Sequence, residues 1–314
     1  MSVVSTDRSV RALLKQGIGQ LRAADVPSFT LAAELLLLHA TGRDRTWLYS
    51  HPEETLAEPV AEAYFALVTR RAAGEPTQHL TGKQEFWGLE FEVTPEVLIP
   101  RPETEHLIEV ALDRLAVREV RAGRTPRTSG ESITLIDVGS GSGCIAVALA
   151  KELPAATIYA SDVSKAALDV ARRNAARHGF AERIYFLECD RFEAFRPERG
   201  QHGGQERGTA GAPRFDLIIS NPPYIGRREA ELLPVEVRHE PEVALFGGDE
   251  GYEFYGLLIP EAAQQLKPGG LLVLELGYNS LPAVQPLFEA GWSNVGVTKD
   301  LAGIPRVVSA ERTS

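Results

Sequence analysis

The chain of 314 residues has few of the features that mark secreted, metal-binding or membrane proteins. It contains only two cysteines, Cys144 and Cys189, with no Cys-x-x-Cys pair and no histidine cluster at ligand spacing. Neither a disulfide framework nor a metal site is therefore expected. No apolar run is long enough to span a membrane, and residues 1–10 carry charge without the apolar stretch of a signal peptide. We expect a cytoplasmic protein with no membrane partner.

Basic residues are also outnumbered. The chain has 33 lysines and arginines and 43 aspartates and glutamates, which gives a net charge of −10. This balance disfavours a partner held mainly through phosphates, so direct binding of nucleic acid is not expected. The length allows two domains.

The first 75 residues are expected to form a small helical domain. Leu31 to Ala40 is an apolar helical stretch followed by Gly42, a plausible stop, and 60–68 is a second helix candidate. Residues 76–97 change character, with aromatic residues on both sides of Gly88, which suggests a β-hairpin linker.

From residue 98 onward, strands and helices alternate, as a doubly wound sheet requires. The expected strands are 133–138, 157–160, 184–188, 215–219, 271–276, 294–298 and 306–310, and the expected helices are 104–115, 145–153, 164–178, 253–266 and 281–290. Between them, the arginine-containing segment 116–131 is expected to be a solvated loop, and 196–214 a mobile insertion. Segment 239–249 is expected to be an ordered loop.

A glycine-rich turn joins the strand 133–138 to the next helix. It reads Gly139-Ser140-Gly141-Ser142-Gly143, where glycines let the backbone turn tightly and approach a ligand. About twenty residues on, Asp162 follows the next strand, where an acidic side chain commonly takes ribose hydroxyls. Dinucleotide binding remains possible, but the Gly-x-Gly-x-Gly spacing favours adenosylmethionine over NAD.

Two further positions have a structural and a functional interpretation each. Asp190 follows the strand 184–188 and could accept from an adenine amino group, or could be a turn residue. Arg101 lies between two prolines and could line a substrate pocket, although Pro102 and Glu103 also suit the first turn of a helix.

The strand 215–219 ends in Asn221-Pro222-Pro223-Tyr224, a rigid turn with fixed carbonyls. A planar amide or amino nitrogen is a poor nucleophile because its lone pair is delocalised. If the Asn221 side-chain oxygen and the Pro222 carbonyl accept its two hydrogens, the lone pair can be aimed at an electrophile. Tyr224 would wall the pocket and could face a cationic methyl donor. The alternative is that Asn-Pro-Pro is only a turn.

In this order the motifs resemble class I adenosylmethionine-dependent methyltransferases, and specifically the protein-(glutamine N5) methyltransferases of peptide chain release factors, the HemK/PrmC family. The resemblance also covers Gln78 to Gly82, Leu98 to Glu105, Glu240 to Tyr255 and Asp300 to Gly303. It implies a seven-stranded sheet ending in an antiparallel hairpin. It also implies helices 1–75 that dock the release factor, and a catalytic domain over 98–314.

The resemblance assigns roles to residues. Gly139 to Gly143 would hold the methionine part of S-adenosyl-L-methionine, and Asp162 its ribose, while Asp190 and Arg191 would flank the adenine. Asn221 to Tyr224, with Arg101, would bind the glutamine of the release factor's Gly-Gly-Gln loop, and Asn221 would also contact the cofactor. Some family members carry an aromatic residue where this chain has Arg191, so stacking on adenine would come from a guanidinium or from elsewhere.

Two other functions use the same features. The first is a DNA or RNA amino-methyltransferase acting on adenine or cytosine, which would need a flipped base and a basic groove. The second is a non-catalytic adaptor that binds release factor without turnover. The insertion also contains Gly203-Gly204-Gln205, which is either chance composition or a pseudosubstrate.

Overall fold

The computed structural model describes residues 7–121, 133–196 and 213–313, and the chain divides into two compact units. The first unit comprises 1–83 and 234–239, and the second 84–233 and 240–314. Most of the expected insertion, including Gly203-Gly204-Gln205, lies outside the described residues, as does the end of the arginine-containing segment.

The first unit is helical. Its helices are α1 (Val10–Ala23), α2 (Phe29–Thr41), α3 (Arg45–Ser50), α4 (Glu58–Ala72) and α5 (Thr77–Thr81). The helix expected over 31–40 corresponds to α2, which ends at Gly42 in the left-handed conformation that glycine adopts at little cost. Apolar faces of α1, α2 and α4 meet in one core that includes Leu21, Leu36, Leu37, Tyr64 and Val68.

The second unit contains a seven-stranded sheet, as the sequence predicted. Its strands are β3 (Thr134–Val138), β4 (Thr157–Asp162), β5 (Ile184–Glu188), β6 (Phe215–Ser220), β9 (Leu266–Glu275), β10 (Trp292–Lys299) and β11 (Pro305–Arg312). Their order is β10-β11-β9-β6-β3-β4-β5. Strand β11 runs antiparallel to β9 and β10, while β9, β6, β3, β4 and β5 pair in parallel. The carboxyl ends of these five strands therefore share one edge.

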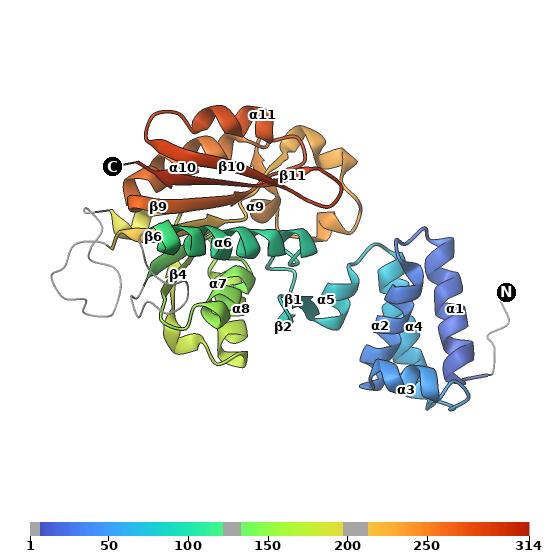
Figure 1. Cartoon of the computed structure of the whole chain (residues 1–314). Coiled ribbons are helices and arrows are strands. Elements are labelled where there is room, and N and C mark those ends of the chain that lie inside the picture. Colours follow the sequence, from blue (N-terminus) through green and yellow to red (C-terminus); the bar gives the residue numbers. More distant parts are fainter. Residues whose placement is uncertain (1–6, 122–132, 197–212, 314) are drawn as a thin grey trace. The chain divides into compact units, whose positions relative to one another are not determined.

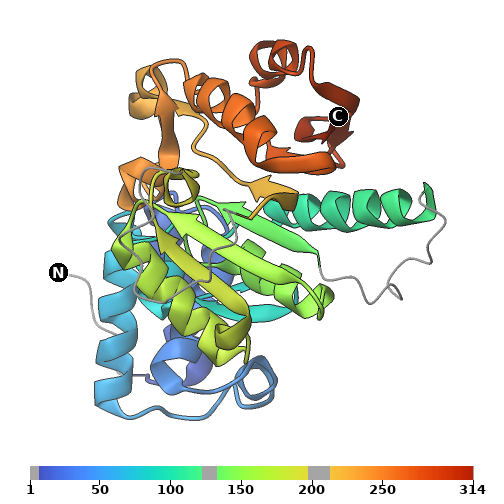
Figure 2. The ribbon, with the colours of Figure 1, turned by 90° about the vertical axis from the view of Figure 1, so that its left-hand side faces the viewer.

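Helices cover both faces of this sheet (Figures 1 and 2). One face packs on α6 (Glu105–Arg121), α7 (Cys144–Glu152) and α8 (Lys165–Arg177), and the other on α10 (Glu253–Gln265) and α11 (Leu281–Val284). Successive strand residues alternate between the two cores: Leu135 and Leu217 point to the first, Ile136 and Ile218 to the second. All four side chains are fully buried, so both faces of the central strands are apolar.

Four expectations were wrong, three of them because of contacts with distant residues. Residues 116–121 are not a loop, since α6 continues to Arg121 and Arg118 donates to the buried Asp216 carboxylate at 3.1 Å. Strand β9 begins at Leu266, five residues early, by pairing with Phe215 across an irregularity.

The other two concern short elements. The helix expected over 281–290 ends at Val284 and tightens into a 3₁₀ turn, Gln285–Leu287, that contains a proline. The loop expected over 239–249 holds the short helix α9 (Glu242–Leu245) and the strand β8 (Phe246–Gly248), which pairs with β7 (Ile225–Gly226).

The expected hairpin consists of β1 (Lys83–Phe86) and β2 (Leu89–Glu92). Trp87 and Gly88 between them both have positive φ, 54° and 67°, as the two-residue turn that matches strand twist requires.

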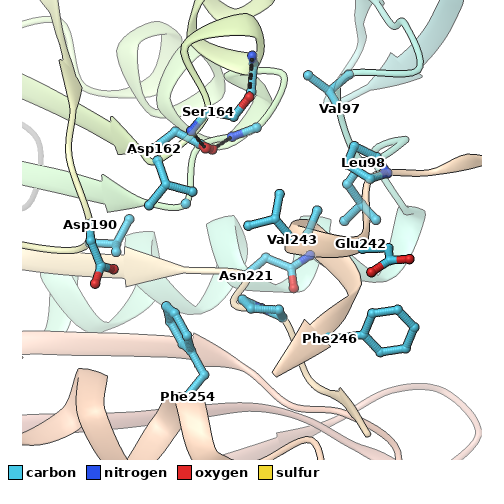
Figure 3. A pocket seen from close by; sticks show the side chains of 18 of the residues that line it. Val97, Leu98, Asp162, Ser164, Asp190, Asn221, Glu242, Val243, Phe246 and Phe254 are labelled. Atoms are coloured by element: carbon cyan, nitrogen blue, oxygen red, sulfur yellow. Dashed lines mark hydrogen bonds between the residues drawn. The ribbon is translucent and has the colours of Figure 1, made fainter. Parts of the chain in front are cut away.

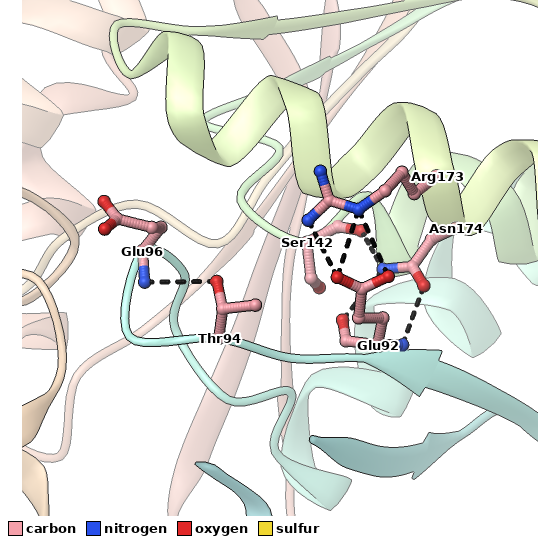
Figure 4. A network of polar contacts seen from close by, with 6 residues as sticks. All are labelled: Glu92, Thr94, Glu96, Ser142, Arg173 and Asn174. Carbon is pink, nitrogen blue, oxygen red and sulfur yellow. Dashed lines mark hydrogen bonds and ion pairs between the residues drawn. The ribbon is translucent and has the colours of Figure 1, made fainter.

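Buried Asn174 on α8 joins the hairpin to the glycine-rich turn (Figure 4). Its Oδ1 accepts from the Glu92 backbone N–H at 2.7 Å, and its Nδ2 donates to the carbonyls of Glu92 at 3.0 Å and Ser142 at 2.9 Å. Arg173 adds an ion pair to the Glu92 carboxylate. One amide side chain therefore holds three segments.

Replacing Asn174 by alanine should lower the free energy of unfolding by about 2–4 kcal/mol, because it leaves buried backbone groups of Glu92 and Ser142 unpaired. Denaturant unfolding followed by circular dichroism would measure the free energy of unfolding of each variant. Arg172→Ala is the matched control, since this side chain is on the same helix and its pair with Asp169 is exposed. Equal stability of the two variants would contradict the prediction.

Candidate functional site

A cavity of about 500 Å³ lies at the carboxyl edge of the parallel strands, where doubly wound sheets bind ligands. Seven of the residues predicted for a site line it: Gly139, Gly141, Asp162, Asp190, Arg191, Asn221 and Pro223. Asn221 extends from the end of β6, with Asp162, Asp190 and Phe254 on one side of it and Glu242 and Phe246 on the other (Figure 3). The cavity thus has two ends that meet at Asn221.

The glycine-rich turn presents bare backbone to this cavity. Gly139 and Gly141 have φ of 73° and 55°, and a Cβ built on either would meet no atom within 4 Å. A side chain there would both strain the backbone and enter the cavity. Gly143 has a different role, since a Cβ there would come within 2.9 Å of Ala171 on α8. Ser140 and Ser142 are buried and do not line the cavity.

Asp162 ties this turn to the start of α8. Its Oδ2 accepts from the Gly141 backbone N–H at 2.9 Å, and its Oδ1 accepts from that of Ser164, also at 2.9 Å. Burial raises the pKa of Asp162, and the backbone N–H groups that it accepts from oppose the shift. Each oxygen keeps a further lone pair, so the carboxylate can accept from a ligand as well.

Beside Asp162, the side of the cavity formed by Asp190 and Arg191 has an aromatic wall that the sequence analysis missed. The Arg191 guanidinium donates to Asp190 Oδ1 at 2.8 Å and to Glu261 Oε2 at 3.1 Å. It also lies 5.8 Å from the centroid of the Phe254 ring. Arg191 is therefore held by carboxylates, and Phe254, which lines the cavity, is the available flat surface.

Asn221 is oriented by a hydrogen bond to a buried residue. Its Nδ2 donates to Thr104 Oγ1 at 3.1 Å, and Thr104 is only 2% exposed. Within the described residues, Oδ1 of Asn221 has no hydrogen-bond partner, so an acceptor oxygen is available at the cavity.

Three other predicted residues do not line the cavity. Pro222 is buried, and Tyr224 points its hydroxyl to Glu275 Oε1 at 3.2 Å, where burial raises the pKa of the phenol. Arg101 forms an ion pair with the buried Glu240, whose other oxygen accepts from the Ile99 backbone N–H. Arg101 thus anchors the segment before η1 (Pro102–Thr104).

Across residues 7–121, 133–196 and 213–313, no group of three or more histidine, cysteine, aspartate or glutamate side chains could hold a metal ion. Within the same ranges no helix is long and apolar enough to cross a membrane.

Comparison with protein families identifies both parts of the chain. Residues 12–82 match the family model of the PrmC N-terminal domain, and residues 129–290 match that of a methyltransferase domain. The catalytic domain of hMettl16, solved in complex with a MAT2A 3'UTR hairpin, has a TM-score of 0.53 at 16% identity over 84% of each chain. At that identity the likeness shows the fold alone, which is that of a methyltransferase domain.

Curated relatives match nearly end to end. A release factor glutamine methyltransferase from Koribacter versatilis is 41% identical over 301 residues, 96% of this chain and 97% of its own length. One from Moorella thermoacetica is 41% identical over 306 residues, 97% and 99% of the two chains. One from Geobacter sulfurreducens is 40% identical over 302 residues, 96% and 95%. The chain belongs to the family of release factor glutamine methyltransferases.

Proposed function

We propose that this protein transfers a methyl group from S-adenosyl-L-methionine to the side-chain amide nitrogen of the glutamine in the Gly-Gly-Gln loop of peptide chain release factors. Near-complete coverage by relatives of that name supports the activity. The observation that carries the chemistry is Asn221, whose Nδ2 is bound to Thr104 while its Oδ1 remains available beside the cavity.

The residues on one side of the cavity suit the cofactor. Gly139 and Gly141 leave open space against the backbone, and Asp162 has acceptor capacity left for hydroxyl groups. Phe254 offers a flat face near Asp190, whose carboxylate can accept from an amino group. When bound, the cofactor supplies an electrophilic methyl group on a positively charged sulfur.

The residues around Asn221 suit an amide substrate. Asn221 Oδ1 accepts one amide hydrogen and the Pro222 carbonyl the other, which aims the nitrogen lone pair along the line of attack. The nitrogen–carbon bond forms as the carbon–sulfur bond breaks, the sulfur leaves as a neutral thioether, and the nitrogen then releases one proton to solvent water. Neither a metal nor a covalent enzyme intermediate is required for this balance. Pro223 and Tyr224 complete the turn that holds these acceptors.

The proposal also assigns a separate role to each of three parts of the chain. Residues 1–75 dock the release factor, 76–97 form a linker, and 98–314 catalyse transfer. The proposal also includes a cytoplasmic location for this reaction. The charge of −10 opposes a nucleic acid as methyl acceptor.

Mass spectrometry of a purified release factor, incubated with this protein and S-adenosyl-L-methionine, tests the function. One added methyl on the glutamine of the Gly-Gly-Gln loop is expected, and none on a substrate in which that glutamine is alanine. No gain with intact cofactor binding would instead point to a nucleic acid acceptor. No gain and no cofactor binding would point to an adaptor.

Phe254 gives a test of the cofactor side. Phe254→Ala should raise the Kd of S-adenosyl-L-methionine roughly tenfold, as measured by isothermal calorimetry. Removing an aromatic ring that stacks on a base costs about 1–3 kcal/mol of binding free energy. Phe254→Tyr retains the ring and should bind within about twofold of wild type. Leu257→Ala, on the exposed side of the same helix, is the control. Unchanged affinity in Phe254→Ala would rule out the stacking role.

A further inference from the structure

The cavity extends beyond Asn221, away from the residues proposed for the cofactor. Glu242 and Phe246 lie on the opposite side of Asn221 from Asp162 and Phe254 (Figure 3). We call this part of the cavity the substrate end. It is lined by Arg227, by segment 96–98 and by residues 241–244 and 246. Because the glutamine amide meets Asn221 in the proposed reaction, the residues next to that glutamine would lie at the substrate end.

Among the described residues that line the substrate end, Arg227 is the one whose side chain has N–H groups to donate. The others are glutamate, valine, leucine, proline, alanine and phenylalanine, whose side chains carry apolar groups or acceptor oxygens. A guanidinium has five N–H donors. The ion pair of Arg227 joins its Nη1 to Glu242 Oε2 at 3.6 Å, which is too long for a hydrogen bond. The donors of Arg227 are therefore available to a ligand.

The position of Arg227 is set by the pairing of two short strands. Arg227 follows β7 directly and Phe246 begins β8, and these strands pair with Ile225 opposite Phe246. The Arg227 guanidinium lies 5.1 Å from the centroid of the Phe246 ring. A guanidinium is attracted to an aromatic face by its plane and its charge, and Glu242 adds the ion pair. The ring and the carboxylate thus hold this exposed cation at the substrate end.

A substrate with two glycines beside its glutamine would place bare peptide groups against this lining. Glycine has no side chain, so nothing would separate the peptide carbonyls from apolar residues such as Val97 and Leu98. A carbonyl that leaves water for an apolar surface costs free energy unless another donor replaces the water. Glu96 and Glu242 can accept from peptide N–H groups, whereas Arg227 is the side chain that can donate to the carbonyls.

We propose that Arg227 is a specificity-determining residue whose guanidinium donates to a backbone carbonyl of the glycine pair beside the target glutamine. The inference rests on the proposed function, since it concerns how the loop that carries this glutamine is bound. In this arrangement Arg227 contacts neither the reacting nitrogen nor the cofactor. Its loss should therefore weaken binding of the release factor and leave the chemical step unchanged.

The next residue in the chain supplies a matched control. Arg228 has the same charge and is also exposed, but it pairs with Glu250 and does not line the cavity. Removing either arginine changes the net charge of the protein by the same amount. A difference between the two variants is therefore due to the position of the side chain and not to charge alone.

The test measures kcat and KM for methylation of a purified release factor, and the Kd of S-adenosyl-L-methionine by calorimetry. Arg227→Ala should raise KM about tenfold, the effect of one lost hydrogen bond from a charged group, with kcat and the cofactor Kd within about twofold of wild type. Arg228→Ala should leave all three quantities within about twofold of wild type. Arg227→Gln keeps a neutral N–H donor and should raise KM less than alanine does.

Salt separates a direct hydrogen bond from attraction at a distance. If Arg227 only attracted an acidic region of the release factor, the difference in KM between wild type and Arg227→Ala would vanish at about 0.5 M salt, where charges are screened beyond a few ångströms. The proposed contact is direct, so most of the difference should remain. Its disappearance would overturn the inference.

The remaining outcomes are distinct. If wild type methylates and Arg227→Ala keeps its KM, or if Arg228→Ala raises KM as strongly, the inference is wrong while the proposed function stands. A cofactor Kd that rises as much as KM would also overturn it, because Arg227 would then act on the cofactor. If wild type transfers no methyl group, the proposed function fails first. Should Arg227→Ala not fold, as judged by its melting curve, Arg227→Met, which has no N–H donor in its side chain, takes its place.

Discussion

Asn221→Ala is expected to lower kcat for glutamine methylation on the order of 10³-fold while leaving the Kd of S-adenosyl-L-methionine nearly unchanged. The variant removes the side-chain oxygen that accepts one substrate hydrogen, and loss of one such preorganised group costs about 10²–10³ in rate. The lost interaction is with the nucleophile, so it appears in turnover. Single-turnover transfer to a purified release factor and calorimetric titration of the cofactor measure the two quantities.

The controls for this variant separate chemistry from folding. Asn294→Gly removes another asparagine side chain, at an exposed position on β10 where φ is 51° and glycine fits without strain. Its rate should match wild type. A rate for Asn221→Ala within tenfold of wild type would show that orientation of the substrate amide does not depend on this side chain. If the Kd of the cofactor also rises in Asn221→Ala, the side chain contributes to binding of the cofactor.

The sequence predicted the positions that local signals determine. Asp162, Asp190 and Asn221 each follow an apolar strand, and the carboxyl ends of parallel strands meet at one edge, so their common location followed from the chain alone. Their location at the cavity agrees with this, whereas their roles stay predictions. The start of α8 also follows from a local signal, because Ser164 caps this helix with its hydroxyl, which accepts from the Ala167 N–H.

The parts that escaped prediction depend on distant partners. Thr104 lies in a helix-start signal, and nothing near it in sequence indicates that it bonds Asn221, 117 residues away. Phe254 looks like any apolar residue of an amphipathic helix. The polar segment that contains Arg118 predicts a loop. In the structure Arg118 lies in α6, and its side chain donates to Asp216 on β6. Each case needs the packed structure, because the local patterns of a single sequence do not reveal which remote residues are in contact.

Asp162→Ala is expected to raise the Kd of S-adenosyl-L-methionine about 100-fold or more. The carboxylate accepts from the backbone of Gly141 and of Ser164, so its loss leaves two N–H groups unpaired and frees the turn that faces the cavity. A hydrogen bond to a charged group contributes about 1.5–3 kcal/mol, and the hydroxyl contacts proposed for the ligand would be lost as well. Isothermal calorimetry measures the affinity.

The matched control is Asp169→Ala. Asp169 is also an aspartate near the start of α8, but it is about half exposed and pairs with Arg172 on the surface. Its Kd should stay within twofold of wild type. Asp162→Asn refines the interpretation, because one side-chain oxygen can still accept from Gly141 while the negative charge is gone. An asparagine variant that binds like wild type would assign Asp162 to holding the turn, whereas one that binds like alanine would assign it to the ligand.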